Sequence, residues 1–163
     1  MFDPPCPLSP AHDLSRFDCG RSVLDDWLRQ RARPSDGVTA RTYVVCTGGQ
    51  IAGYYCLAAG SVARARLATA RLRSNTPDEV PVIILGRLAV DRRFARRGVG
   101  STMLRDGLGR AVEASRIVGV RADLVHALDD EAAAFWRGYG FQSSPVDPRT
   151  LQLGVEKIVA ALG

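Results

Sequence analysis

The feature that most constrains the fold is a strand pattern that runs through a glycine-containing loop into a helical pattern. Residues 81–90, PVIILGRLAV, are apolar and β-branched enough to form a central strand. A loop with four arginines follows, and from Gly98 the apolar residues recur at helical spacing to about Gly119. Residues 120–127, VRADLVHA, then give a further central strand. Strand, helix and strand in this order predict a right-handed crossover and a parallel pair of strands.

The N-terminal part of the chain adds a helix and a hairpin. Ser22 and Asp25 have the spacing of a capping box, and the apolar residues after them predict a helix that ends near Ala32. Two strand patterns then meet at Gly48 and Gly49, which is typical of a hairpin turn.

The remaining segments complete one domain. Residues 64–78 are polar and arginine-rich, and they predict a loop with one helical turn. Asp129 can cap a short helix that Gly140 ends, and residues 150–155 predict a last strand before a terminal helix. No internal repeat or linker interrupts the 163 residues. The sequence therefore predicts a single α/β domain over 1–163, with a mixed, mostly antiparallel central sheet flanked by helices.

Length and composition exclude several classes of protein. No apolar run reaches the roughly 18 residues of a membrane span, and residues 1–10 lack the charged start and apolar stretch of a signal peptide. The cysteines show neither a CxxC pair nor a histidine at metal-ligand spacing, which argues against a zinc site and a disulfide framework; they are Cys6, Cys19, Cys46 and Cys56. We therefore expect a reduced, cytoplasmic protein with no metal and no membrane association.

Nearly every cation of the chain is an arginine. Lys157 is the only lysine, and the net charge is +5. Codon bias in a GC-rich genome would enrich arginine, while a phosphate-bearing partner would also favour it, because arginine binds phosphate through two bonds. The clustering favours a polyanionic partner. The clusters are Arg29, Arg31 and Arg33; Arg64, Arg66, Arg71 and Arg73; and Arg92, Arg93, Arg96 and Arg97.

The loop before the long helix has the features of an anion-binding site. The first N–H groups of a helix have no partner within the helix, and the helix dipole favours negative charge there. Gly98 and Gly100 let the backbone turn these groups toward a ligand, and Arg96 and Arg97 can add charge-assisted bonds. The pattern predicts a phosphate ligand, above all a diphosphate, while a plain helix start remains the alternative.

Two common diphosphate sites do not fit this sequence. A P-loop needs GxxxxGK[ST], and the loop contains no lysine. A dinucleotide site needs GxGxxG after the first strand of a βαβ unit, and Met103 occupies the position of the third glycine. Both sites are excluded.

The segments RLAVDRRFARRGVGSTML and DDEAAAFWRGYGF, with a strand between them, together resemble the GNAT superfamily of N-acetyltransferases. The resemblance covers about residues 40–155 and implies a loop of the form Q/R-x-x-G-x-G/A that holds the pyrophosphate of acetyl-coenzyme A (acetyl-CoA). Ala95 departs from the Gln or Arg of this pattern, which leaves the backbone amides in place. The residues that the resemblance assigns to the coenzyme are Leu88, Ala89, Val90, Arg96, Arg97, Gly98, Val99, Gly100, Ser101, Asp129 and Phe135.

Some of these residues have a structural interpretation as well. Leu88 and Val90 can be ordinary strand core while their backbone pairs with the pantetheine arm. Asp129 can act as the N-cap of its helix. Phe135 is expected to pack under the coenzyme and to belong to the core.

A narrower resemblance spans nearly the whole chain, including the N-terminal segment FDCGRSVLDDWLRQRA and the later segments VPVIILGRLAVD and SSPVDPRTLQL. These segments are similar to the TacT-type acetyltransferase toxins of bacterial toxin–antitoxin pairs. The resemblance implies acetylation of the α-amine of an aminoacyl-tRNA, a block of translation, and neutralisation by a small ribbon-helix-helix antitoxin. The arginines expected to contact the tRNA phosphates are Arg29, Arg31, Arg33, Arg64, Arg66, Arg71 and Arg73. The preferred aminoacyl group and homodimer formation are left open.

Acetyl transfer needs a neutral amine, a group that stabilises the oxyanion, and a proton for the leaving thiolate. An α-amine has a pKa of about 7.7–8.0, so part of it is neutral near pH 7. The resemblance implies that a backbone N–H in Leu88–Val90 stabilises the oxyanion. Trp136 stands at the position of the family's tyrosine acid, and its indole is not a practical acid. Tyr139, three residues on, is the candidate acid, with packing against the core as its alternative.

Two other functions remain open on the sequence alone. One is a metabolic or protein N-acetyltransferase, and the other is a catalytically silent module that binds acetyl-CoA or a partner without turnover. The tryptophan at the acid position is the feature that supports the second of these alternatives, while an active enzyme remains the leading interpretation.

Overall fold

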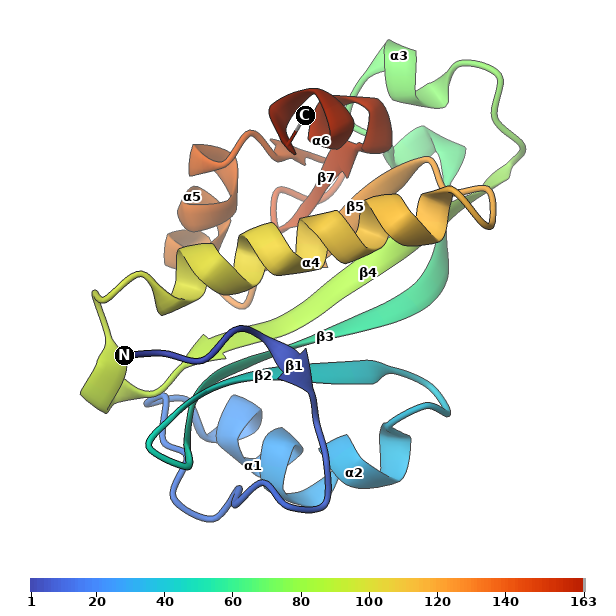
Figure 1. Cartoon of the computed structure of the whole chain (residues 1–163). Helices are drawn as coiled ribbons and strands as arrows, with labels where there is room; N and C mark the ends of the chain where they lie inside the picture. The colour runs from blue at the N-terminus through green and yellow to red at the C-terminus, as the bar shows by residue number, and fades with distance from the viewer. Residues whose placement is uncertain (163) are drawn as a thin grey trace. The chain divides into compact units, whose positions relative to one another are not determined.

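The structure is a computed structural model that describes residues 1–162 (Figure 1). Within these residues seven strands form one sheet in the order β1-β2-β3-β4-β5-β7-β6. The chain divides into two compact units. Unit 1 holds Met1–Ala58 and Gly86–Gly107, and unit 2 holds Ala59–Leu85 and the chain from Leu108 onward. Each contains parts of three long elements: β3 (Gln50–Ala63), β4 (Glu79–Val90) and α4 (Val99–Ser115).

Unit 1 is built on antiparallel strands. β1 (Cys6–Pro7) pairs with β2 (Arg41–Thr47), and β2 pairs with β3. β2 and β3 meet at Gly48 and Gly49, whose φ angles of 55° and 78° require glycine for the turn. The predicted hairpin is confirmed. β1 was not predicted, because two residues are too few to show a strand pattern.

Helices α1 (Ser22–Gln30) and α2 (Ala32–Ser35) lie on one side of the strands of unit 1 (Figure 1). The predicted capping box is wrong. The N-cap is Arg21, which makes no side-chain capping bond, and the Asp25 carboxylate accepts a 2.9 Å hydrogen bond from the N–H of Cys19. This bond fixes the turn before the helix rather than the helix end itself.

The apolar face of α1 forms the core of unit 1. Leu24 and Leu28 belong to one buried cluster with Tyr54 of β3, which we call the α1 cluster. The Tyr54 hydroxyl donates a 2.6 Å hydrogen bond to the Leu24 carbonyl, so the buried phenol has a partner for its polar end. Burial of a leucine side chain of this kind contributes about 1.5–3 kcal/mol. The start of α4 approaches β3 closely, since a Cβ on Gly53 would lie 2.8 Å from Met103 Cε.

Unit 2 carries the predicted parallel pair. β4 pairs in parallel with β5 (Ala122–His126), with Val82 opposite Ala122, and this prediction is confirmed. β7 (Thr150–Gly154) runs antiparallel to β5, and β6 (Gln142–Ser143) runs antiparallel to β7. The sheet is therefore mixed and mostly antiparallel, as the sequence predicts.

The short helices of unit 2 also follow the predicted order. Residues 64–78 contain the 3-10 helix η1 (Arg64–Arg66) and the one-turn helix α3 (Ala70–Arg73). Helix α5 (Asp130–Gly138) follows β5, and helix α6 (Val155–Leu162) follows β7. That the whole chain 1–163 is a single domain stays a prediction.

A buried cluster on one face of β5 includes Leu67, Val82 and Leu124. The neighbouring residue Asp123 is fully buried, and neither of its carboxylate oxygens has a hydrogen-bond partner within residues 1–162. Burial therefore raises the pKa of Asp123 well above its ordinary value.

Candidate functional site

Strand β4 is irregular just before the arginine-rich loop. Arg87 has a φ of 58°, in the left-handed region that residues other than glycine rarely adopt. Ala89 is buried in the α1 cluster, whereas the side chain of Val90 lies 3.7 Å from the position of a Cβ on Gly100 in α4. Residues 88–90 therefore separate the α1 cluster from the start of α4. Leu88 and Val90, for which strand core is the structural interpretation, are half-buried, and coenzyme contacts of Leu88–Val90 stay predictions.

Asp91 anchors the loop that follows, and its side chain is fully buried. Its Oδ1 accepts hydrogen bonds from the Arg93 backbone N–H (2.9 Å) and Nε (3.0 Å). Its Oδ2 accepts from Arg93 Nη2 (3.0 Å) and from the Asp18 N–H (3.1 Å). The Asp91 N–H in turn donates to the Ala52 carbonyl of β3 at 2.8 Å. One carboxylate thus ties the loop to the N-terminal segment and to β3.

The first two arginines of the loop are neutralised by carboxylates of unit 1. Burial alone would raise the pKa of Asp91, but the hydrogen bonds from Arg93 and Asp18 outweigh it and bring the pKa below its ordinary value. Its bond with Asp91 raises the pKa of Arg93. Arg92 forms an ion pair with Asp18, which lowers the pKa of that carboxyl. Arg92 and Arg93 therefore hold the loop in place and leave little charge for a ligand.

Arg96 and Arg97 differ from this first pair. Both side chains are exposed, and neither makes a hydrogen bond or ion pair within the described residues. Arg96 has a φ of 61° and Gly98 a φ of 82°. A Cβ on Gly98 would meet no atom within 4 Å, so the positive φ is the local reason for glycine at this position.

The start of α4 supplies backbone donors beside these arginines. The Thr102 N–H donates the first helical hydrogen bond, 3.0 Å long, to the Gly98 carbonyl. The N–H groups of Val99 and Gly100 precede it at the helix end that favours negative charge. With the two guanidinium groups, this arrangement can hold a phosphate or diphosphate. We call residues 95–101 the anion loop.

Helix α5 carries the other candidate residues. Asp129 caps it, since its Oδ1 accepts a 2.8 Å hydrogen bond from the Ala132 N–H, which confirms the predicted capping role. Phe135 is 37% exposed, so its assignment to the core is wrong. Successive helical residues point about 100° apart, and Ala133 and Trp136 take the inward face. Coenzyme contacts of Asp129 and Phe135 stay predictions.

Tyr139 and Trp136 have different surroundings. Trp136 is 7% exposed and packs against Phe141, with ring centroids 5.2 Å apart. Tyr139 is the C-cap of α5 and is 44% exposed, so the alternative that it is a core residue is wrong. Its ring centroid lies 5.1 Å from that of Phe135. The structure gives Trp136 a packing role and keeps Tyr139 at the surface, while both catalytic assignments stay predictions.

The arginines near α1 are held unequally. Arg29 donates to the Phe17 carbonyl at 2.7 Å and pairs with Asp26 at 3.2 Å. Arg33 donates to the carbonyl of His12. Arg31 makes no side-chain hydrogen bond or ion pair within residues 1–162. Within residues 1–162, Arg31 is thus the arginine of this cluster whose side-chain donors are all available to a partner.

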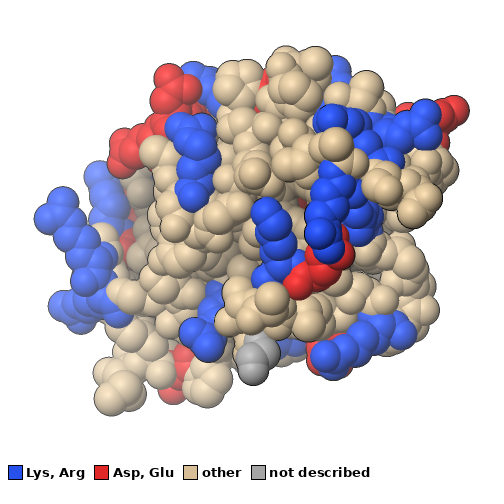
Figure 2. All heavy atoms as spheres, turned by 90° about the horizontal axis from the view of Figure 1, so that it is seen from above, with Lys and Arg blue, Asp and Glu red and all other residues tan. Residues whose placement is uncertain are grey.

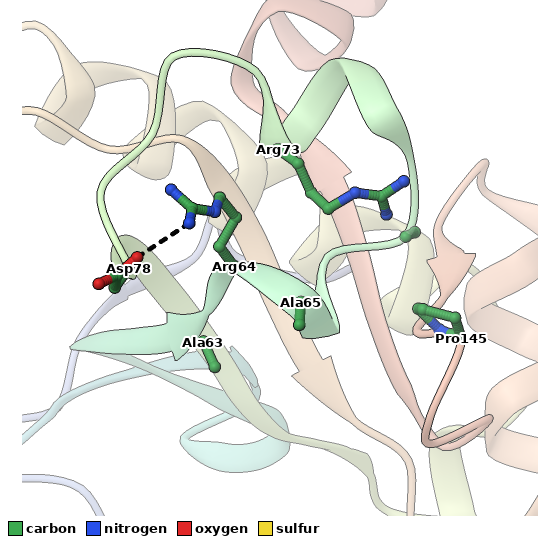
Figure 3. Close-up of a pocket in the computed structure, with 7 residues that line it drawn as sticks. Ala63, Arg64, Ala65, Arg73, Asp78 and Pro145 are labelled. Atoms are coloured by element: carbon green, nitrogen blue, oxygen red, sulfur yellow. Dashed lines mark hydrogen bonds and ion pairs between the residues drawn. The ribbon is translucent and has the colours of Figure 1, made fainter.

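A pocket of about 740 Å³ in unit 2 lies beside the second arginine cluster (Figure 3). Arg64 Nη2 pairs with Asp78 at 2.9 Å, and Arg73 Nη1 donates to the Leu67 carbonyl at 2.8 Å. The walls contain no residue of the anion loop or of α5; they are Ala63, Arg64, Ala65, Ala68, Arg73, Asp78 and Pro145. The two arginines of the pocket are thus bound within the protein.

Of the other two arginines in the second cluster, one is also bonded within the protein and one is not. Arg71 pairs with Glu156 at 3.4 Å, and Arg121 reaches the same carboxylate at 3.2 Å. Arg66 is exposed and, in the part of the chain that the structure describes, makes no side-chain hydrogen bond or ion pair. Figure 2 shows this mixture on one face, where some basic side chains touch acidic ones and others do not.

Sequence reasoning missed three residues that shape the site. Asp91 had a local signal, because an aspartate that directly follows a strand stands two residues before Arg93. Arg87 and Trp27 had none, since they are distant in the sequence. In the structure the Arg87 guanidinium carbon lies 4.3 Å from the centroid of the Trp27 ring.

The four cysteines are free, and burial raises the pKa of Cys19 and of Cys56 to about 11, so both thiols are weak nucleophiles at neutral pH. Among residues 1–162 no group of three or more His, Cys, Asp or Glu could hold a metal ion. No helix in the same range is long and apolar enough to cross a membrane.

This arrangement, in which a strand leads through the anion loop into a helix, is typical of proteins that bind a diphosphate-bearing molecule at the helix end. The family model of the acetyltransferase (GNAT) family matches residues 8–141, and the chain belongs to this family of acetyltransferases. This confirms the resemblance on which the acetyl-CoA expectation depends.

Individual relatives and solved structures show which acetyltransferases this chain is similar to. A tRNA-acetylating toxin of Mycobacterium tuberculosis is 47% identical over 163 residues, which cover 99% of this chain and 98% of the relative. A structure of AtaT complexed with acetyl-methionyl-tRNAfMet has a TM-score of 0.90 at 27% identity and covers 100% of both chains. A mutant AtaT toxin bound to the C-terminus of the antitoxin AtaR and acetyl-CoA has a TM-score of 0.82 at 27% identity, over 99% and 97% of the two chains.

Proposed function

We propose that this chain is an acetyl-CoA-dependent N-acetyltransferase toxin that acetylates the α-amine of aminoacyl-tRNA and so blocks translation. The observation that carries the proposal is its 47% identity, over 99% of the chain, with a tRNA-acetylating toxin. Neighbours of the same fold that are bound to acetyl-methionyl-tRNA and to acetyl-CoA support the two substrates.

The anion loop is suited to the pyrophosphate of acetyl-CoA. The N–H groups of Val99 and Gly100 and the guanidinium groups of Arg96 and Arg97 would bind its oxygens, since these arginines make no bond within the described residues. Ala95, in place of the family's Gln or Arg, removes one side-chain contact and leaves the backbone donors unchanged. No metal is needed for this binding.

The chemistry follows from the groups around the acetyl thioester. The neutral α-amine attacks the carbonyl carbon, and a backbone N–H of residues 88–90 donates to the oxyanion that forms. The nitrogen loses a proton to solvent, the C–S bond breaks to leave the amide, and the thiolate takes a proton. A thiol of pKa about 8.5 leaves readily, so the acid accelerates this step without being indispensable. Tyr139 is the proposed acid because its ring is 44% exposed, unlike that of Trp136.

The acid assignment has its own test. Tyr139→Phe keeps the ring packing against Phe135 and removes the hydroxyl, so we expect kcat to fall by roughly 10²–10⁴-fold with acetyl-CoA affinity unchanged. Steady-state kinetics with charged tRNA measure both quantities. Full activity of this variant would exclude Tyr139, and a rate gain in Trp136→Tyr would show that a hydroxyl at position 136 reaches the sulfur.

The partners and location of the protein are part of the proposal. An antitoxin would neutralise the enzyme, because AtaT is bound to the C-terminus of its antitoxin AtaR in a structure of the same fold. We infer an antitoxin of the ribbon-helix-helix type and action in the cytoplasm, where charged tRNA is found; the sequence leaves open whether the toxin forms a homodimer. Sedimentation of the purified protein measures its oligomeric state.

The decisive experiment is incubation of the purified protein with labelled acetyl-CoA and total charged tRNA. We expect label on the α-amine of one or more aminoacyl adenosines released from the tRNA. Label on a polyamine or a protein lysine, with none on charged tRNA, would identify a metabolic or protein acetyltransferase. Tight acetyl-CoA binding without any transfer would identify a silent module.

A further inference from the structure

Arg87 forms the top of an aromatic column in unit 1. Its guanidinium carbon lies 4.3 Å from the centroid of the Trp27 ring. The Trp27 ring is within 5° of parallel to the Tyr54 ring, with centroids 6.1 Å apart. Phe17 contacts Tyr54 edge-on at 5.4 Å, and the Tyr54 hydroxyl is bonded to a backbone carbonyl of α1. The column supports the Arg87 guanidinium from the side of α1.

The backbone is strained to put an arginine at this position. Arg87 has a φ of 58°, in the left-handed region that a residue with a Cβ rarely adopts. Arg87 contacts Trp27 of α1, and Ala89 is buried in the same α1 cluster, so both side chains leave β4 toward α1. Val90 leaves it toward the start of α4 and the anion loop.

The Arg87 guanidinium is also available to a ligand. The residue is exposed, and within residues 1–162 its side chain makes the contact with Trp27 and no hydrogen bond or ion pair. Arg92 and Arg93, by contrast, are neutralised by Asp18 and Asp91. A flat, charged group supported from below by an indole is a surface on which a nucleobase stacks.

The position of this surface suits the end of a charged RNA. In the proposed function, the N–H groups of residues 88–90 face the reacting carbonyl, and Arg87 directly precedes them. The aminoacyl group of a charged tRNA is esterified to the ribose of the 3′-terminal nucleotide, whose base is unpaired. The base is joined to the reacting amine through the aminoacyl ester and one ribose, so we expect it to lie near the strand when the amine reaches the thioester.

We propose that the Arg87–Trp27 stack holds the unpaired 3′-terminal base of the substrate RNA and so positions the aminoacyl group for transfer. This inference rests on the proposed function. An arginine that only contacted a phosphate would hold the RNA without stacking on a base, so the fluorescence of that base would not change on binding. A stacking surface needs the guanidinium plane, which lysine lacks.

The test uses an RNA hairpin with a single-stranded 3′ end whose last base is the fluorescent analogue 2-aminopurine. Stacking quenches this base, so we expect the wild-type protein to quench it on binding. Arg87→Lys retains the charge and should lose the quenching and about tenfold in affinity. Trp27→Leu should also lose the quenching, and a blunt hairpin should bind wild type and Arg87→Lys equally. Arg116→Lys, at an exposed arginine directly after α4, is the control for the substitution itself.

Kinetics separate a positioning role from a structural one. In Arg87→Lys we expect the KM for charged tRNA to rise by about tenfold while acetyl-CoA affinity and thermal stability stay unchanged. Arg87→Gln, which keeps a planar end group without charge, should retain part of the quenching. Full quenching by Arg87→Lys would overturn the stack in favour of a phosphate contact. A wild type that acetylates tRNA without quenching would overturn it while the proposed function stands, whereas a wild type that neither binds nor acetylates RNA would overturn both.

Discussion

The arginine-rich segments Arg64–Arg73 and Arg92–Arg97 look alike in the sequence and differ in what their guanidinium groups already bind. In the first segment most side chains are bonded within unit 2, and Arg66 is the exception among the described residues. In the second segment Arg92 and Arg93 bind carboxylates of unit 1, whereas Arg96 and Arg97 bind none within residues 1–162.

This difference shows that the number of arginines does not mark an anion site. Carboxylates and carbonyl groups near an arginine decide how much of its charge a ligand meets. Exposed ion pairs are worth only about 0–1 kcal/mol, so the paired arginines are not locked. A phosphate must nevertheless compete with the partner that is already bound. The unpaired arginines are therefore the better guide to both substrates.

The largest effect that tests this comparison is expected at the glycine of the anion loop. Gly98→Asp adds a carboxylate and a strained φ where the N–H groups meet the diphosphate, so acetyl-CoA affinity should fall by at least about 100-fold. Gly49→Asp is the matched control, because Gly49 has a similar φ of 78° against 82° and equally open surroundings. Titration calorimetry measures both. Gly100→Asp should behave like Gly98→Asp. A folded Gly98→Asp variant with unchanged acetyl-CoA affinity would contradict the assignment of the anion loop to the pyrophosphate.

Asp91→Asn should produce the next largest effect. The variant deprives Arg93 of its buried partner and puts an amide donor against the N–H groups of Asp18 and Arg93. We expect a loss of about 2–4 kcal/mol in the free energy of unfolding at pH 7, with weaker acetyl-CoA binding.

The pH dependence supplies the control for this variant. The pKa of Asp91 is lowered in the folded protein, so its stabilisation is complete above the unfolded value near 3.9 and is lost as the pH falls through the lower folded value. Urea titrations of wild type and Asp91→Asn should therefore converge at low pH. A constant difference from pH 7 down to pH 2 would contradict the assigned ionisation.

Smaller effects are expected from the unpaired arginines on tRNA binding. Arg31→Gln and Arg66→Gln should each weaken tRNA affinity by about 3–10-fold and reduce the salt slope by about one. Arg29→Gln and Arg64→Gln, one turn or less away, should do less because these arginines are already bonded within the protein. Filter binding at several salt concentrations measures the slope. Equal losses of tRNA affinity in the variants of unpaired and of bonded arginines would refute the rule that unpaired arginines mark the RNA surface.

The smallest expected effect concerns Asp123, the buried carboxyl of unit 2 that contrasts with Asp91. Its pKa is raised, so the folded state keeps the proton and stability falls as the pH rises above the unfolded value near 3.9. Asp123→Asn removes this titration, and its melting temperature should fall less than that of the wild type between pH 5 and pH 8. Parallel pH profiles for the two proteins would show that the carboxyl has a partner in solution.

The sequence predicted features that depend on short stretches of chain. The strand, anion loop and α4 follow one another within a single pattern, Gly48 and Gly49 form a local turn, and Asp129 caps the helix that begins beside it. Each of these features is determined by residues within a few positions. For the same reason the sequence pattern alone indicates a turn at Gly98, which has a φ of 82° in the structure.

Errors and omissions arose where distant residues or helix faces decide the outcome. Asp25 bonds to Cys19 outside its helix, so its spacing from Ser22 was misleading. In the nine residues of α5 the periodicity could not decide whether Phe135 or Trp136 faces inward. The contact of Arg87 with Trp27 joins a strand to a helix far away in the sequence, and no local pattern reports it.

The bond between Asp91 and Asp18 has a consequence for folding kinetics. It joins residues 73 positions apart, and closing so long a stretch of chain costs entropy before the contact stabilises anything. We therefore expect the anion loop to become ordered late, after the β2–β3 hairpin has formed. A chain that is still being synthesised would then not acetylate the tRNAs of its own ribosome. The reason is that the acetyl-CoA site forms only when folding is nearly complete.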